Sequence, residues 1–198
     1  MTRKLLRCVL LAAAIPVAGS ALAEMPGLRG TDHLGFTVPD IDQAVSFFED
    51  VIGCQPFFAL GPFSGGDSDW MNVHLDVDAK ATIPMLRTMR CGHGVNLEIF
   101  TYTAPDQNTT PPKNSDIGGH HLAFYVDDMA AAVAHLNAKG VKMFGDPTPM
   151  TEGPSAGETW MYFIAPWGMT LELVSYPNGK AYESESSDHL WTAKDPSS

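Results

Sequence analysis

The chain has 198 residues, enough for one compact domain or two small modules. A hydrophobic share of 44% with 18% charged residues is ordinary for a globular protein and argues against a disordered chain. The formal net charge of −11 makes nucleic acid and anionic membranes unfavourable partners, because both carry charge of the same sign.

The first 23 residues are typical of a secretory signal peptide. Three basic residues open the segment, an apolar stretch interrupted by Pro16 follows, and the small residues 21–23 fit a signal peptidase site. An uncleaved membrane anchor is the alternative, but the apolar stretch is too short to span a bilayer comfortably. We therefore expect a periplasmic or secreted protein, without membrane attachment, that begins near Glu24. Cleavage removes three basic residues and no acidic one, which takes the formal charge from −11 to −14.

The first predicted elements are a strand and a helix. Residues 33–38 alternate between apolar and small or polar side chains, the period of a half-buried strand. Asp40 and Gln43 form a capping-box pattern before a helical stretch over 41–52. Gly53 stands where helices commonly end.

The same pattern returns in the second half of the chain. A strand over 121–126 is followed by Asp128 as a helix cap and by a helical stretch over 129–140. Each half ends in further strands, and an inserted loop over 61–80 distinguishes the first half. The sequence therefore predicts an α+β fold of two tandem βαβββ modules. The expected divisions are a signal peptide at 1–23, modules at 24–104 and 117–176, a Pro-rich linker at 105–116 and a polar C-terminal tail at 177–198.

Two cysteines remain after signal cleavage, Cys54 and Cys91. If the last three strands of the first module form an antiparallel meander, these two residues lie side by side, and an exported protein can hold a disulfide there. Two buried free thiols are the alternative, and the sequence leaves both open.

Each module is expected to place one histidine and one glutamate on the sheet face away from its helix, here called the open face. In the first module these are His33 and Glu98, and in the second they are His121 and Glu172. Burying two carboxylates without partners is unfavourable, so four such residues at equivalent positions indicate a metal site. Imidazole and carboxylate ligands suit a divalent ion such as Ni, Co, Zn, Mn or Fe.

The paired motifs, DHLGFTV with NLEIF and HHLAFYV with TLELV, resemble the vicinal oxygen chelate superfamily of glyoxalases, bleomycin-resistance proteins and extradiol dioxygenases. The resemblance implies that the modules form a cup around one divalent metal ion. The implied ligands are His33, Glu98, His121 and Glu172, a set similar to that of bacterial glyoxalase I. Extradiol dioxygenases typically use two histidines and one glutamate, so Glu98 is a departure from their pattern.

This resemblance implies a metal-dependent lyase or isomerase, similar to lactoylglutathione lyase. A small substrate with neighbouring oxygens would react through a metal-stabilised enediolate, with Glu172 as the base and Glu98 as its partner. An exported protein is separated from the main glutathione and CoA pools, so we expect another small oxygenated substrate. Candidate substrate-binding residues are Tyr125, Trp70, Trp160 and Arg87.

Two other functions remain open at this point. One is an Fe(II) extradiol-type dioxygenase, and the other is a non-catalytic protein that binds a small molecule in the cup. In many two-module relatives the cup forms between subunits, so a homodimer is expected.

Overall fold

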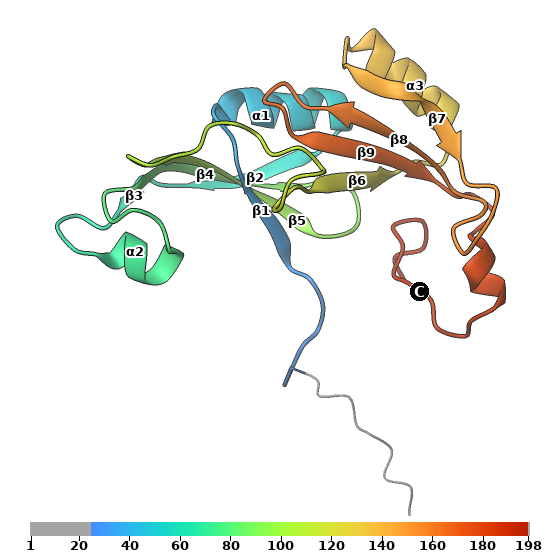
Figure 1. Ribbon diagram of the computed structural model, residues 1–198, viewed down its shortest axis with the longest axis horizontal. Helices are drawn as coiled ribbons and strands as arrows, with labels where there is room; N and C mark the ends of the chain where they lie inside the picture. The colour runs from blue at the N-terminus through green and yellow to red at the C-terminus, as the bar shows by residue number, and fades with distance from the viewer. Residues whose placement is uncertain (1–24, 198) are drawn as a thin grey trace, which may run out of the picture. The chain divides into compact units, whose positions relative to one another are not determined.

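The computed structural model describes residues 25–197, and the predicted signal peptide at 1–23 lies outside them (Figure 1). The chain divides into a unit that ends at Thr31 and a compact unit over Asp32–Ser198, which holds all the helices and strands described below. Among the described residues, no helix combines the length and the apolar character that a membrane crossing requires.

The first module is a mixed sheet with a helix on one face. The sheet has the order β1-β5-β4-β2, in which β1 runs parallel to β5 and the remaining pairs are antiparallel. Its elements are β1 (His33–Thr37), α1 (Ile41–Phe47), a π-helical turn (Phe48–Ile52), β2 (Gln55–Leu60), β4 (Thr82–Arg90) and β5 (Asn96–Thr103).

The second module repeats this arrangement. Its sheet has the order β6-β9-β8-β7, again with the first strand parallel to the last. The elements are β6 (His121–Tyr125), α3 (Met129–Ala138), β7 (Met143–Pro149), β8 (Thr159–Ile164) and β9 (Thr170–Ser175). The predicted α+β class with two tandem βαβββ modules is therefore confirmed.

Local chemistry explains where the two main helices begin. The Asp40 carboxylate accepts hydrogen bonds from the backbone N–H groups of Asp42 and Gln43, both at 3.0 Å. Asp128 accepts one from the backbone N–H of Ala131, also at 3.0 Å. These acceptors satisfy donors that the first helical turn leaves free.

The inserted segment 61–80 is more ordered than the predicted loop. It contains β3 (Phe63–Ser64), which pairs with β4, and the short helix α2 (Trp70–Leu75). Of the α2 side chains, Met71 is buried and packs in a small apolar cluster with Ala81 and Ile83. The prediction of a loop was wrong here because one buried residue in a six-residue helix produces no readable period.

One hydrophobic core joins the two modules on their helix-bearing side. The Trp167 ring, in the turn between β8 and β9, lies 5.5 Å from the Phe47 ring and 5.6 Å from the Phe48 ring. The His135 side chain of α3 bonds through Nε2 to the Val51 carbonyl at 2.8 Å. Figure 1 shows α1 and α3 on the same side of the two sheets. Within one chain, therefore, the two open faces do not pack against each other.

Cys54 and Cys91 form a disulfide, with their Cα atoms 4.2 Å apart. The neighbouring pair Gln55 and Arg90 are partners in the β2–β4 ladder, so the expected meander does bring the two cysteines together. Of the two alternatives that the sequence left open, the structure has the disulfide.

Candidate functional site

The first pair of predicted metal ligands, His33 and Glu98 (below, the first ligand pair), lies on neighbouring strands of the first sheet. Gly35 is the ladder partner of Glu98, and a Cβ there would lie 3.3 Å from the Phe100 ring. His33 Nε2 is 3.2 Å from Glu98 Oε2. On the other side of the ring, His33 Nδ1 bonds to Asp32 Oδ1 at 2.7 Å. The Asp32 hydrogen bond and, after it, the Glu98 charge raise the pKa of His33.

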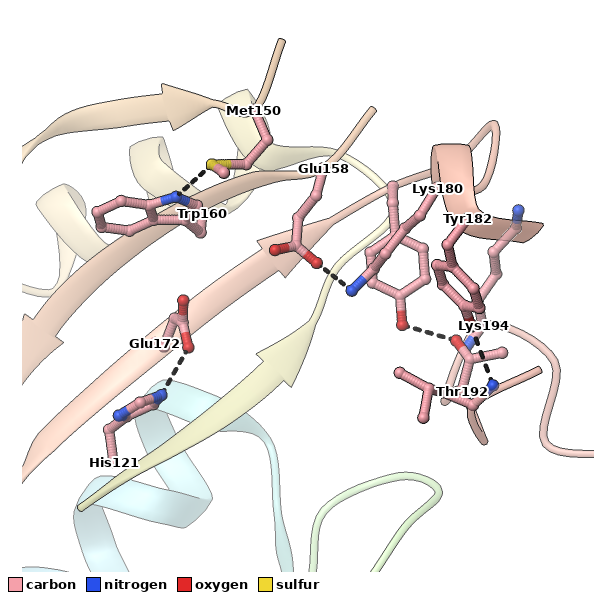
Figure 2. A network of polar contacts seen from close by, with 11 residues as sticks. His121, Met150, Glu158, Trp160, Glu172, Lys180, Tyr182, Thr192 and Lys194 are labelled. Atoms are coloured by element: carbon pink, nitrogen blue, oxygen red, sulfur yellow. Dashed lines mark hydrogen bonds and ion pairs between the residues drawn. The ribbon is translucent and has the colours of Figure 1, made fainter. Parts of the chain in front are cut away.

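The second ligand pair, His121 and Glu172, repeats this geometry in the second sheet (Figure 2). His121 Nε2 is 3.1 Å from Glu172 Oε2, and Ala123 is the small ladder partner of the glutamate. The Glu172 side chain is 11% exposed, against 25% for Glu98. Burial raises the pKa of Glu172, and the neighbouring His121 acts in the opposite direction.

The structure thus brings each predicted pair together, but it does not bring the two pairs together. Over residues 25–197, no three His, Cys, Asp or Glu side chains gather where they could hold one metal ion. Each pair offers one imidazole nitrogen and one carboxylate oxygen, which is half of the four-residue set that the sequence predicts.

Two of the predicted substrate-binding residues lie on the open face of the second module. The Trp160 ring is 5.2 Å from the Tyr162 ring, which is in turn 5.1 Å from the His121 ring. The Tyr125 ring is 4.9 Å from the Tyr176 ring, and burial raises the pKa of Tyr125. An aromatic wall therefore flanks the second ligand pair.

The other two predicted residues lie away from the ligand pairs. Trp70 begins α2, is 47% exposed and places its ring 4.9 Å from the His74 ring. Arg87 is the ladder partner of Ile99, whereas Thr88 is the partner of Glu98. Because successive strand residues point to opposite faces, Arg87 lies on the face opposite Glu98, away from the predicted metal ligands.

Four residues near the pairs were missed by sequence reasoning: Asp32, Tyr162, Glu158 and Lys180. Asp32 could have been noticed as a carboxylate next to a candidate ligand histidine, a common arrangement at metal sites. Tyr162 could have been found only from the strand register, since it is the ladder partner of Glu172. Glu158 and Lys180 form an ion pair that sequence spacing does not reveal.

Two cavities include residues of the open faces, and the predicted linker lines each of them, although none of the four predicted metal ligands does. One cavity of about 540 Å³ includes Gly35, Thr37 and Tyr102 of the first open face together with residues 107–112. Another of about 450 Å³ includes Tyr162 of the second open face together with part of the same segment. Volumes of this size are typical of small-molecule sites.

Known proteins share this fold and sequence pattern. A profile described as the glyoxalase/bleomycin resistance protein/dioxygenase superfamily matches residues 32–163. The chain is 47% identical, over 168 residues, to a 2-epi-5-epi-valiolone epimerase from Actinomyces sp, an alignment that covers 84% of this chain and 90% of that relative.

Two solved structures illustrate the fold. A glyoxalase family protein from Bacillus cereus is 18% identical, with a TM-score of 0.58 over 79% of this chain and 98% of that one. The fosfomycin resistance protein FosX from Listeria monocytogenes, solved with Mn(II) and sulfate, is 14% identical, with a TM-score of 0.50 over 80% of this chain and 99% of that one. At such identities these structures establish the fold alone.

Proposed function

The chain belongs to the glyoxalase/bleomycin resistance protein/dioxygenase superfamily, the vicinal oxygen chelate superfamily of the sequence analysis, and within it we propose that the protein is a metal-dependent epimerase. Its substrate would be a small hydroxylated ketone, inverted at a carbon next to the carbonyl. The observation that carries the proposal is the 47% identity to a 2-epi-5-epi-valiolone epimerase. The two His–Glu pairs supply residue types suited to this reaction.

The donor set fits a divalent metal ion such as Ni, Co, Zn, Mn or Fe. In each pair an imidazole Nε2 and a carboxylate oxygen lie 3.2 or 3.1 Å apart, close enough to share one ion after a small adjustment. Asp32 holds Nδ1 of His33, as carboxylates commonly do for metal-ligating histidines. When bound, such an ion would polarise the substrate carbonyl as a Lewis acid.

We further propose that the complete site forms between two copies of the chain. Each copy carries one ligand pair on each open face, and packing within the chain uses the opposite, helix-bearing side. A second copy that faces these surfaces would join the first pair of one chain to the second pair of its partner.

Exposed apolar side chains on the first module support such an interface. Exposed apolar side chains are often found at protein interaction sites, and all of β2 is exposed here. The residues concerned, on β2, β3 and α2, are Phe57, Phe58, Leu60, Phe63, Trp70, Val73 and Leu75.

Inversion of a carbon needs proton removal on one face and proton delivery on the other. Glu172 is the better base, because burial raises its pKa toward the range in which a carboxylate accepts a proton effectively. Glu98, from the opposing module, would return a proton to the other face. Aromatic rings around Glu172, among them the ring of its ladder partner Tyr162, would exclude water from the substrate.

Metal analysis of the mature protein is the first test. We expect about one tightly bound divalent ion for each complete set of four ligands, and its loss in His121→Ala. A parent protein that retains none of Ni, Co, Zn, Mn or Fe(II) after reconstitution would contradict metal dependence.

Turnover is tested by incubating the reconstituted protein with 2-epi-5-epi-valiolone in deuterated water. NMR should show deuterium at the carbon next to the carbonyl together with the epimer, and Glu172→Gln should slow formation of the epimer by about 10²–10⁴-fold. Glu49→Gln, an exposed carboxylate on the helix-bearing side, is the matched control. Unchanged rates in Glu172→Gln would contradict the role of this base, and oxygen uptake with catechol would instead identify a ring-cleaving dioxygenase.

Export is part of the proposal. The Cys54–Cys91 disulfide is of a kind that persists in oxidising compartments such as the periplasm or the extracellular medium. Mass spectrometry of the protein from its native cell should give a mature chain that starts near Glu24. An intact N-terminus in a cytosolic fraction would contradict export.

A further inference from the structure

Glu158 and Lys180 form an ion pair beside the second ligand pair (Figure 2). Glu158 directly precedes β8, four residues before Tyr162, so strand alternation puts both side chains on the open face. Tyr162 is in turn the ladder partner of Glu172. Lys180 comes from the predicted C-terminal tail, which thereby contributes a charged group to the same face.

Both charged side chains are largely buried and held in place. Their exposed fractions are 14% for Glu158 and 19% for Lys180, and Lys180 Nζ lies 4.3 Å from the centre of the Tyr176 ring. Backbone hydrogen bonds anchor the residues that follow: Ala181 N–H donates to the Ala156 carbonyl at 2.9 Å. An ion pair formed by an exposed lysine would be mobile and would contribute little to stability, whereas the Lys180 ammonium has a defined position.

A close backbone approach reinforces this anchoring. Gly157, at φ +99°, lies so near the chain at Gly179 that a Cβ on Gly157 would be 2.7 Å from the Gly179 carbonyl oxygen. Any larger residue at 157 would push away the segment that carries Lys180. The glycine therefore allows the tail to dock against the loop before β8.

The ion pair lies on the same open face as Glu172. Tyr162 is the ladder partner of Glu172 and shares its face of β8 with Glu158. A substrate bound against Glu172 would therefore face both groups.

The first module has no counterpart to this pair. The strand registers match Thr88 to Tyr162, and the residue four positions before Thr88 is Pro84, whereas the residue four positions before Tyr162 is Glu158. In the second module, Tyr176 follows the last strand and Lys180 stands four residues after it. The equivalent tyrosine of the first module is Tyr102, and the residue four positions after it is Asp106 rather than a lysine. The duplicated ligand positions thus differ in what surrounds them, as expected when one half binds the part of the substrate that does not react.

We propose that Glu158 and Lys180 bind hydroxyl groups of the substrate ring that lie away from the reacting carbon, and so select a polyhydroxylated cyclic ketone. This inference rests on the proposed epimerase function. A carboxylate accepts hydrogen bonds from hydroxyl groups and an ammonium donates up to three, so together they suit a ring that carries several. Aromatic faces such as that of Trp160 would pack on the apolar faces of the ring.

The charge balance of the pair also bears on the substrate class. One carboxylate and one ammonium cancel, so the pair adds no net charge to the site. It therefore suits an uncharged polyol.

The test compares two probes that share the reacting group. 2-Epi-5-epi-valiolone carries many hydroxyl groups, whereas 2-hydroxycyclohexanone keeps the neighbouring ketone and hydroxyl alone. Binding is measured by calorimetry, and hydrogen–deuterium exchange next to the carbonyl is followed by NMR on the same metal-reconstituted samples. Lys180→Met should weaken binding of 2-epi-5-epi-valiolone by about 10- to 100-fold, as expected for loss of a charged hydrogen-bond donor, and Glu158→Gln should weaken it in the same direction.

Several controls separate recognition from structure. Binding of 2-hydroxycyclohexanone should change by less than about two-fold in Lys180→Met, because that probe lacks the hydroxyl groups in question. Lys180→Arg, which keeps the charge, should retain most of the binding. Lys194→Met removes a positive charge from an exposed position of the same tail and should leave binding of both probes unchanged.

The outcomes distinguish this inference from the proposed function. Selective loss of 2-epi-5-epi-valiolone binding in Lys180→Met supports the inference even without exchange, in which case the epimerase proposal alone fails. Equal loss for both probes, no loss for either, or a wild-type protein that binds neither probe would overturn the inference.

Discussion

Two inactive variants should restore each other if the metal site forms between subunits. His33→Ala removes a ligand from the first pair and His121→Ala removes one from the second. In a mixed dimer, one of the two sites then carries both substitutions and the other carries neither. Random mixing makes half of the dimers mixed, so we expect about a quarter of the wild-type activity per chain.

The assay uses the two variants with different affinity tags, unfolded together, refolded oxidatively and reconstituted with metal. Native mass spectrometry gives the fraction of mixed dimers, and activity is followed as deuterium incorporation into 2-epi-5-epi-valiolone. Each variant alone should be inactive. Mixed dimers that form in the expected proportion and remain inactive would refute the reasoning, because they would place all four ligands within one chain.

Three further predictions concern the disulfide and the protonation of the ligand pairs. Replacing Cys54 and Cys91 together by serine opens a link across 37 residues and should lower the free energy of unfolding by about 3–4 kcal/mol, measured by urea unfolding; an unchanged value would contradict a stabilising disulfide. Burial raises the pKa of Glu172, so the folded metal-free chain binds this proton more tightly than the unfolded chain. Stability should therefore fall as the pH rises from the unfolded pKa of about 4.3 through the higher pKa of the folded chain. Glu172→Gln should remove that part of the pH dependence in EDTA-treated protein, and a pH dependence identical to that of the parent would contradict the assigned burial. Asp32→Asn should lower the pKa of His33 toward its ordinary value of about 6.5, followed by NMR titration without metal, and should weaken metal binding by about 10- to 100-fold; an unmoved pKa would show that Asp32 does not hold the ring.

The internal repeat made the fold predictable. Once residues 33–38 and 121–126 are aligned, strand alternation alone gives the open face of each module. The two His–Glu pairs followed from that alignment, and the structure places each pair within 3.2 Å. The repeat served as an internal alignment, in which agreement at equivalent positions separated candidate ligands from ordinary strand residues.

What the sequence could not provide was the register between strands and the path of the tail. Arg87 and Thr88 are adjacent, yet only the register shows that Thr88, and not Arg87, is the partner of Glu98. Lys180 lies 22 residues from Glu158, beyond any local spacing rule, and only the docked tail brings them together. The relation between the two pairs depends on packing between modules, and in the proposed dimer between chains, which no local pattern encodes.

The different surroundings of Glu98 and Glu172 lead to a last prediction. The duplication preserved the ligand positions, but the ladder partner is Thr88 for Glu98 and Tyr162 for Glu172, and the exposed fractions are 25% and 11%. An epimerase needs one carboxylate deprotonated and the other protonated before each turnover, and unequal surroundings separate their proton affinities.

Each single variant should therefore retain one half of the reaction. In deuterated water, Glu98→Gln should still exchange the proton of the epimer whose C–H faces Glu172, without converting it into the other epimer. Glu172→Gln should exchange only the proton of the epimer whose C–H faces Glu98. NMR of each pure epimer with metal-reconstituted variants measures this directly, with metal content determined on the same samples. If both variants lose exchange from both epimers equally, a single group moves both protons, and the assignment of one carboxylate to each face of the substrate is wrong.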